Sequence, residues 1–153
     1  MHAIPDRDSR IGIAWEHFQS ACESWIGPRF FPYRNGDPCE SFQDMFLCQA
    51  RLYVFGDRYD IKALQCLVLY KLRRALSVFT LFPQRVSDVF MLIGYTYDNT
   101  PDGDDLRALL TDYALCKVTF FCEHEDWDLF MREERTFTVE LLAKLRGLEA
   151  GQY

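Results

Sequence analysis

Apolar side chains recur at intervals of three and four residues along most of this 153-residue chain. The clearest case is residues 50–76, ARLYVFGDRYDIKALQCLVLYKLRRAL, in which two such stretches flank the tetrapeptide DRYD. A period near 3.6 places apolar side chains on one face of an α-helix, whereas a half-buried strand would alternate at every second residue. The sequence therefore predicts two amphipathic helices joined by a tight corner.

The pattern also predicts where these two helices begin and which face each buries. Ser41 and Asp60 are expected as N-caps, since their side-chain oxygens can accept hydrogen bonds from first-turn N–H groups. The first helix should run to about Tyr59 and bury Phe42, Met45, Phe46, Gln49, Leu52 and Tyr53. The second should bury Ile61, Leu64, Val68, Leu72, Ala75 and Phe79. Gly56 is either tolerated, at up to roughly 1 kcal/mol relative to Ala, or allows two helices to approach closely.

Similar patterns predict a helix before this pair and further helices after it. The first, capped at Ser9 and ended by Gly27-Pro28, should pack through Ile11, Trp15, Phe18, Cys22 and Trp25. Arg29–Pro38 is expected to be a loop. After the pair, Pro83 should open a helix that buries Val86, Val89, Phe90, Ile93 and Tyr97.

The last third of the chain predicts three more helical segments. Beyond the turn at 98–103, a helix should carry Leu106, Leu109, Leu110, Tyr113, Ala114, Lys117, Val118 and Phe121 in register. A short helix is expected around 126–132. The final one should be capped by Thr136 or Thr138, end at Gly147 or Gly151, and carry Phe137, Leu141, Leu142 and Leu145.

These patterns indicate an all-α fold, a small bundle of about five to six helices. We expect residues 1–40 to form an N-terminal helix plus an irregular segment, and residues 41–148 to form the helical domain. Half the chain is apolar (49%) and 16% is aromatic, which is a globular composition.

Charge and cysteine usage narrow the class of protein. A formal charge of −6 and a pI near 5.0 argue against nucleic acid or an anionic membrane as partner. No apolar run reaches the roughly 18–20 residues of a membrane span, and MHAIPDRDSR does not resemble a secretory signal. The six cysteines, scattered within helical patterns, are expected to be reduced core residues of an intracellular protein, in the cytoplasm or the nucleus.

The charges fall into two blocks. Residues 58–85 hold six basic side chains and one acidic one, whereas residues 98–134 hold eleven acidic and three basic ones. Either these are two solvated faces that attract each other across the fold, or the basic helix face docks an acidic partner.

Cys116, Cys122 and His124 are the candidates for a metal-binding or redox regulatory site. Structural zinc typically takes four ligands in closely spaced pairs such as Cys-x-x-Cys, and the chain has no such pair. Helical core cysteines beside a surface histidine are the simpler interpretation. Calcium is not expected either: Asp98, Asp102, Gly103 and Asp104 fit an EF-hand loop in part, but its position 12 is Leu109.

No combination of residues indicates an enzyme. The three histidines are His2, at the terminus, and His17 and His124, on polar faces, and none has an evident nucleophile and orienting group. A cluster of carboxylates at Glu123, Glu125, Asp126 and Asp128 is expected to be solvated. We therefore predict no catalytic, cofactor-binding or metal-binding residues and no cofactor.

The helix pair resembles the end of the BTB/POZ domain in a large group of fungal proteins. The matching residues are Arg51, Tyr53, Val54, Asp57, Arg58, Tyr59, Asp60 and Ile61, followed by Leu64, Leu67, Leu69, Lys71, Leu72 and Leu76. Further similar residues are Val86, Asp88, Val89, Tyr95, Tyr97, Asn99, Thr100, Leu106, Arg107 and Tyr113. The likeness covers about residues 48–145 and is to a BTB tail plus a BACK-like helical extension, whereas residues 1–40 do not resemble the BTB core.

The resemblance implies a non-catalytic protein–protein interaction module, an adaptor or scaffold of BTB type. BTB proteins dimerise and often serve as cullin ubiquitin-ligase adaptors, so it implies protein partners, among them a second copy of the chain or a ubiquitin-ligase component. Two alternatives remain: the cysteine/histidine metal-binding or redox module, and a truncated BTB gene product without independent activity.

Overall fold

A computed structural model describes residues 7–151. These residues form eight α-helices and one short 3-10 helix, and no strand occurs among them. The helices are α1 (Arg7–Ser20), α2 (Gln43–Arg58), α3 (Lys62–Val78), η1 (Pro83–Arg85), α4 (Val86–Asn99), α5 (Asp105–Cys116), α6 (Val118–Cys122), α7 (Trp127–Glu133) and α8 (Arg135–Glu149). The all-α prediction is confirmed, with more helices than the five to six expected.

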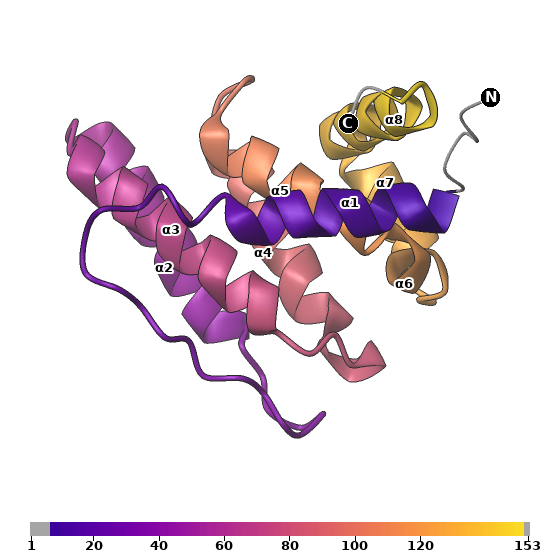
Figure 1. The fold of residues 1–153 in the computed structure, drawn as a ribbon, viewed down its shortest axis with the longest axis horizontal. Coiled ribbons are helices and arrows are strands. Elements are labelled where there is room, and N and C mark those ends of the chain that lie inside the picture. Colours follow the sequence, from indigo (N-terminus) through magenta and orange to yellow (C-terminus); the bar gives the residue numbers. More distant parts are fainter. Residues whose placement is uncertain (1–6, 152–153) are drawn as a thin grey trace.

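The helices pack around one core. α2 and α3 form a hairpin on one side, and α4 packs against α2 (Figure 1). α5 packs between α1, which crosses it, and α8. Phe18 of α1 contacts Tyr113 of α5 with ring centroids 5.7 Å apart, and both belong to the same buried cluster as Phe137 of α8. The N-terminal helix therefore contributes to the same core as the rest of the chain.

The predicted buried faces are confirmed for most positions. All five residues predicted for α4 are buried, as are Val68, Leu72 and Ala75 of α3 and Phe79 directly after it, while Leu64 is partly buried. The prediction was wrong for Leu52, Ile61 and Leu142, whose side chains are 40%, 41% and 44% exposed. Leu52 and Leu142 lie on the solvent side of α2 and α8, and Ile61 precedes α3 as its N-cap residue.

The corner between α2 and α3 is closed by the backbone and not by a side-chain cap. Asp60 adopts φ 54°, and the N–H groups of Asp60 and Ile61 donate to the carbonyls of Asp57 and Gly56 at 3.3 and 2.7 Å. This is the Schellman pattern, whose left-handed position is most often glycine. Asp60 as N-cap of α3 was therefore wrong, because its conformation terminates α2.

Gly56 allows the two helices of the hairpin to approach closely. A Cβ atom built at this position would lie 3.0 Å from Gln65 Cγ and 3.3 Å from the Ile61 carbonyl oxygen. Of the two interpretations of this glycine, the close approach is the one the structure supports.

Substitutions of Asp60 should reveal the strain of its left-handed backbone. Asp60→Gly should raise the free energy of unfolding by about 0.5–1 kcal/mol, because glycine adopts positive φ without steric cost. Asp60→Val should lower it by about 1–2 kcal/mol, because a β-branched residue is disfavoured there. Urea unfolding followed by circular dichroism measures both changes. Equal stabilities for the two variants would contradict this assignment.

The start of α2 depends on a side chain from α4. Phe42, not Ser41, occupies the N-cap position, and its N–H donates to Asp88 Oδ2 at 2.8 Å. Asp88 is buried and also lies 3.6 Å from the Arg85 guanidinium. Ser41 was therefore wrong as the N-cap position, although its hydroxyl accepts a hydrogen bond from the Gln43 N–H at 3.4 Å.

The first helix is shorter than predicted. It includes Ser9, which therefore is not its cap, and it ends at Ser20 instead of continuing to Gly27-Pro28. Trp25 leaves the helix direction and stacks on Tyr70 of α3, with ring centroids 4.6 Å apart. The following segment is an irregular loop, as predicted.

Basic side chains of α3 hold this N-terminal region in place. Arg73 donates to the Phe18 carbonyl at 3.2 Å and Arg74 donates to the Phe30 carbonyl at 3.3 Å. Lys71 lies 5.2 Å from the centroid of the Phe30 ring. No ion pair within residues 7–151 joins the basic block to the acidic block. The basic residues of α3 thus serve internal packing, which neither interpretation of the charge blocks anticipated.

The predicted helix at 106–121 is divided at Lys117. The N–H of Lys117 donates to the carbonyls of both Tyr113 and Ala114, and its ammonium lies 3.9 Å from the centroid of the Trp15 ring. Burial lowers the pKa of Lys117. The break directs Phe121 into the core against Tyr113, with ring centroids 6.4 Å apart.

The caps of the last helices are only partly as predicted. Asp104 caps α5 by accepting from the Leu106 N–H at 2.8 Å. Thr136 and Thr138 both lie inside α8, and Glu134 precedes that helix, so neither threonine is the cap. Gly151, with φ 73°, directly follows Ala150, the C-cap of α8, and confirms the second of the two predicted ends.

Candidate functional site

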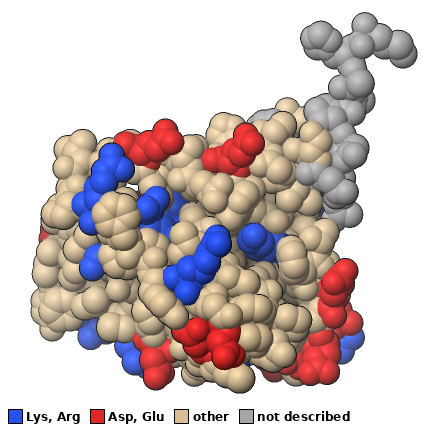
Figure 2. Space-filling view, turned by 60° about the horizontal axis from the view of Figure 1, so that its bottom comes forward, with Lys and Arg blue, Asp and Glu red and all other residues tan. Residues whose placement is uncertain are grey.

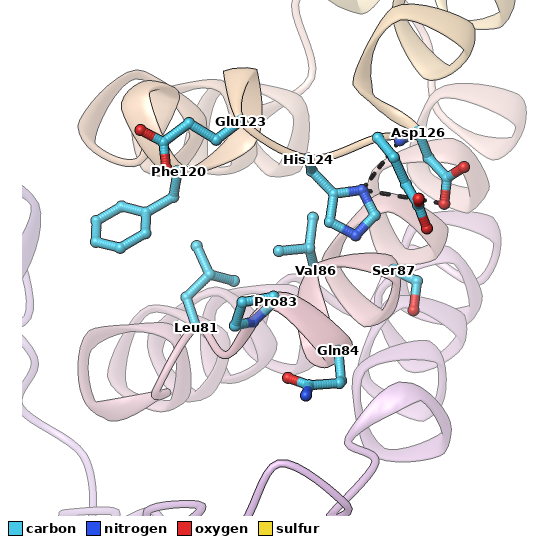
Figure 3. A pocket seen from close by; sticks show the side chains of 10 residues that line it. Leu81, Pro83, Gln84, Val86, Ser87, Phe120, Glu123, His124 and Asp126 are labelled. Atoms are coloured by element: carbon cyan, nitrogen blue, oxygen red, sulfur yellow. Dashed lines mark hydrogen bonds and ion pairs between the residues drawn. The ribbon is translucent and has the colours of Figure 1, made fainter.

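A groove lies between the segment that enters α4 and the segment that joins α6 to α7. Its volume is about 630 Å³. Figure 3 shows the two walls facing each other across it. The lining residues are Leu81, Pro83, Gln84, Val86 and Ser87 on one wall, and Phe120, Glu123, His124, Glu125 and Asp126 on the other.

The side-chain amide of Asn35 holds the first wall in place through two hydrogen bonds to the backbone of Thr80. Asn35 is buried, its Nδ2 donates to the Thr80 carbonyl at 2.8 Å, and its Oδ1 accepts from the Thr80 N–H at 2.6 Å. Pro83 then opens η1, as its fixed φ and missing N–H favour. The N-terminal loop thereby determines where Leu81 and Pro83 lie.

The second wall rests on a cluster of aromatic rings. Phe90 stacks on Phe130 with centroids 4.3 Å apart and contacts Phe121 and Trp127 at 5.4 and 5.8 Å. The His124 ring meets the face of Phe90 edge-on at 5.6 Å. These contacts bury the inner side of the segment that joins α6 to α7. The carboxylates of Glu123, Glu125 and Asp126 therefore lie on its outer side, along the groove.

The groove combines an apolar surface with negative charge. Phe120 is 55% exposed, and Leu81, Pro83 and Val86 lie on the wall opposite (Figure 3). Glu123, Glu125 and Asp126 contribute three carboxylates, and no Lys or Arg side chain is among the lining residues. The chemistry that fits such a surface is a cationic group next to an apolar one.

His124 and Asp126 share the groove with Ser87, but they are not arranged as a catalytic triad. In a triad the histidine Nδ1 carries a proton that it donates to the carboxylate. Here His124 Nδ1 accepts a hydrogen bond from the Asp126 backbone N–H at 3.2 Å, and the Asp126 carboxylate oxygen lies 3.9 Å away. The histidine therefore stabilises the turn at 124–126.

The three candidates for a metal or redox site do not form one. Cys116 is buried, Cys122 is exposed, and His124 is largely covered by Phe90, which corrects its assignment to the polar surface. Within the described part of the chain, no three His, Cys, Asp or Glu side chains are placed to hold a metal ion. Burial and the nearby Asp112 raise the pKa of Cys116 to about 11, which disfavours the thiolate that a metal requires.

The cysteines are mostly not core residues. All six are free; Cys116 is buried, Cys22 is half-buried, and the other four, Cys39, Cys48, Cys66 and Cys122, are exposed. The prediction of core cysteines was wrong for these four, because Cys39 lies in the loop before α2 and the helices of the other three present a different face to the core.

The partial EF-hand pattern has a structural use. Asp102 pairs with Arg107 at 2.9 Å, and Asp104 caps α5 and accepts a hydrogen bond from Tyr53 at 3.2 Å. Gly103 adopts φ 77°, which the turn requires. These acidic residues begin a helix and contact its neighbours.

The sequence singled out the acidic residues of this groove but not their apolar neighbours. Glu123, Glu125 and Asp126 were expected to be solvated, and Phe120 and Pro83 were assigned no role beyond their helices. Two observations could have drawn attention to the site: Phe120 falls outside the core register, and the carboxylates follow it directly. The opposite wall, 37 residues earlier at Pro83, has no sequence signal.

Other surface charges are dispersed. On the face shown in Figure 2, Lys and Arg side chains and Asp and Glu side chains occur in small groups separated by uncharged surface. No described helix is long and apolar enough to span a bilayer.

Comparison with known proteins found no matching family model, no matching curated protein and no matching solved structure.

Proposed function

We propose that this chain is a non-catalytic protein–protein interaction module, an adaptor or scaffold, whose groove binds a basic and partly apolar segment of another protein. The observation that carries the proposal is the composition of the groove: an exposed Phe120 with apolar residues opposite, three carboxylates and no basic lining residue. An apolar anchor gives such a contact its affinity, whereas charge complementarity increases the association rate and selects the partner.

The shape of the groove supports recognition of an extended segment. Its walls come from two separate parts of the chain, each held by buried contacts: Asn35 with Thr80 on one side, and Phe90 with its aromatic neighbours on the other. A preformed groove loses little conformational entropy when a partner binds.

The resemblance to the BTB tail with a BACK-like extension supports the adaptor role. The residues that carry it lie in the α2–α3 hairpin and in α4 and α5, and α4 begins with Val86 and Ser87 in the first wall of the groove. We propose on this basis that the chain is BTB-tail/BACK-like and that its partners are proteins.

Selection of phage-displayed peptides on the folded chain tests this proposal. The enriched peptides should combine Lys or Arg with an aromatic or aliphatic residue, and their binding should weaken as salt is raised. For a synthetic peptide of the enriched sequence, Phe120→Asp should raise the dissociation constant by about tenfold or more in fluorescence anisotropy. Combined Glu123→Lys and Glu125→Lys should abolish binding of the basic peptide.

Two matched variants outside the groove serve as controls. Leu129→Asp changes an apolar side chain that is 56% exposed on α7, and Asp128→Lys reverses a nearby exposed charge that does not line the groove. Both should leave peptide affinity unchanged. Enrichment of acidic peptides, or equal binding by Phe120→Asp and the unaltered chain, would refute the groove as the binding site.

A further inference from the structure

A second groove lies between the corner that joins α2 to α3 and the turn that begins α5. Its volume is about 330 Å³. Asp57 and Lys62 line it from the corner, and the turn contributes the other charged residues, which are Asp102, Asp104 and Asp105. Four of these five charged residues are carboxylates, so we call this surface the aspartate groove.

Two of the four carboxylates are free to bind a cation. Asp102 and Asp104 are already engaged by the contacts described above for the start of α5. Asp57 and Asp105 are exposed, and neither forms an ion pair or a side-chain hydrogen bond with another residue of 7–151. Among the described lining residues the one cation is Lys62, whose ammonium is 3.6 Å from the carboxylate of Asp60.

Gln65 adds an unused polar group to the aspartate groove. It is 8% exposed and lines the groove, and its side-chain amide forms no hydrogen bond within the described part of the chain. Its Cγ is packed against α2, where a Cβ built at Gly56 would approach it to 3.0 Å. A buried amide without a partner is rare, because it has given up its hydrogen bonds to water. The position of Gln65 therefore points to a polar ligand in the groove.

The chemistry of the aspartate groove fits a ligand with two ammonium groups on an aliphatic chain. An ammonium donates up to three hydrogen bonds, which carboxylate and amide oxygens accept. Leu69 and Pro101 also line the groove and offer apolar contact to methylene groups. A metal ion fits this surface less well, because no three His, Cys, Asp or Glu side chains of the described residues are placed to hold one.

We infer that the aspartate groove binds a linear aliphatic polyamine, with one ammonium group on Asp57 and the Gln65 amide and another on Asp105. The second wall is held by Tyr53, whose hydroxyl donates to Asp104 Oδ2 at 3.2 Å. Burial and the nearby Asp104 carboxylate raise the pKa of Tyr53, so its hydroxyl remains a donor at neutral pH. The site is separate from the groove proposed for the partner protein, whose residues lie in 81–87 and 120–126.

Isothermal titration calorimetry of the full chain with 1,4-diaminobutane at low salt tests the site. One diamine should bind per chain, and 1-aminobutane, which has a single ammonium group, should bind at least about tenfold more weakly. Asp57→Asn and Asp105→Asn should each raise the dissociation constant of the diamine about tenfold. Asp44→Asn removes an exposed carboxylate at the other end of α2, so it is the matched control and should leave the affinity unchanged.

Two further variants distinguish a built site from general attraction to exposed carboxylates. Gln65→Leu should raise the dissociation constant of the diamine about tenfold, with an unchanged circular-dichroism spectrum. Lys62→Ala should lower it about threefold, because a like charge leaves the groove. Phe120→Asp should bind the diamine as the unaltered chain does, which separates this test from that of the proposed partner groove.

Three results would overturn the inference. The first is the absence of binding at millimolar diamine. The second is an unchanged affinity in Gln65→Leu, because exposed carboxylates would then attract the diamine without the amide. The third is binding of Ca²⁺ or Mg²⁺ that is as tight as that of the diamine and is lost in Asp57→Asn, because the groove would then be a metal site.

Discussion

Leu72→Ala is expected to lower the free energy of unfolding by about 2–5 kcal/mol. Leu72 is fully buried at the centre of α3, in the core that also contains Phe46 of α2 and Tyr113 of α5. Removing its three outer carbon atoms loses their transfer free energy and leaves a cavity. Helices from several parts of the chain surround this position, so the site can collapse only partly.

Two substitutions on the same helix provide the comparison. Leu64→Ala should cost less than Leu72→Ala, because Leu64 is only partly buried. Lys62→Ala should change stability by less than about 0.5 kcal/mol, since the Lys62 side chain is 77% exposed and its ion pair with Asp60 is solvated. Urea denaturation measures all three, and equal small effects would show that the face assigned to α3 is wrong.

Arg107→Ala should lower the free energy of unfolding by about 2–4 kcal/mol, since one buried and one partly buried carbonyl lose this donor. The guanidinium of Arg107 donates to the carbonyls of Tyr97 and Thr100 and to the Thr100 hydroxyl, the first at 3.1 Å and the last at 3.0 Å. It also lies 4.5 Å from the centroid of the Tyr97 ring. These contacts join the end of α4 to α5 across the turn at 98–104.

Of the two ion pairs of Arg107, with Asp102 and Glu140, the shorter one, with Asp102, is expected to contribute much less than these hydrogen bonds. Its partner Asp102 is 93% exposed, so Asp102→Ala should cost less than about 1 kcal/mol. Arg107→Lys should fall between wild type and Arg107→Ala, because an ammonium keeps the charge but cannot replace the planar fork of donors. Thermal unfolding of the three variants distinguishes these contributions. A large effect of Asp102→Ala with a small effect of Arg107→Ala would contradict this interpretation.

The helix faces were predictable because their signal is local. Val86, Val89, Phe90, Ile93 and Tyr97 repeat at helical spacing, and a 3.6-residue period places them on one side whatever surrounds them. The first-turn position of Pro83 follows for a similar reason, since its fixed φ and missing N–H are properties of the residue itself.

The two cap positions predicted for α2 and α3 were wrong for different reasons, one distant in the sequence and one local. The donor at Phe42 is satisfied by Asp88 of α4, and the corner after α2 is closed by backbone groups with Asp60 in a left-handed conformation. The type of residue at Ser41 or Asp60 permits a cap but does not determine at which residue the helix begins or which backbone conformation that residue adopts.

Only part of the candidate groove could be recognised from the sequence. The carboxylates of 123–126 are conspicuous in the sequence, but the groove also needs Leu81 and Pro83, which Asn35 positions through Thr80. Three segments far apart in the chain thus contribute to one surface. Helical periodicity cannot show that these three segments lie together, because it reports only which residues share one face of a single helix.

The sequence by itself determined that this chain folds into amphipathic helices, where most of them lie and which side chains form their apolar faces, because these properties depend on residues within one or two turns of each other. Only the tertiary structure decided how much of each face is covered. It buried the centre of the α3 stripe, left Leu52, Phe55 and Tyr59 exposed on α2, and used the basic residues of α3 to hold the N-terminal loop. The physical reason is that burial and hydrogen bonding depend on which distant segment arrives at a surface, which is set by the packing of the whole chain.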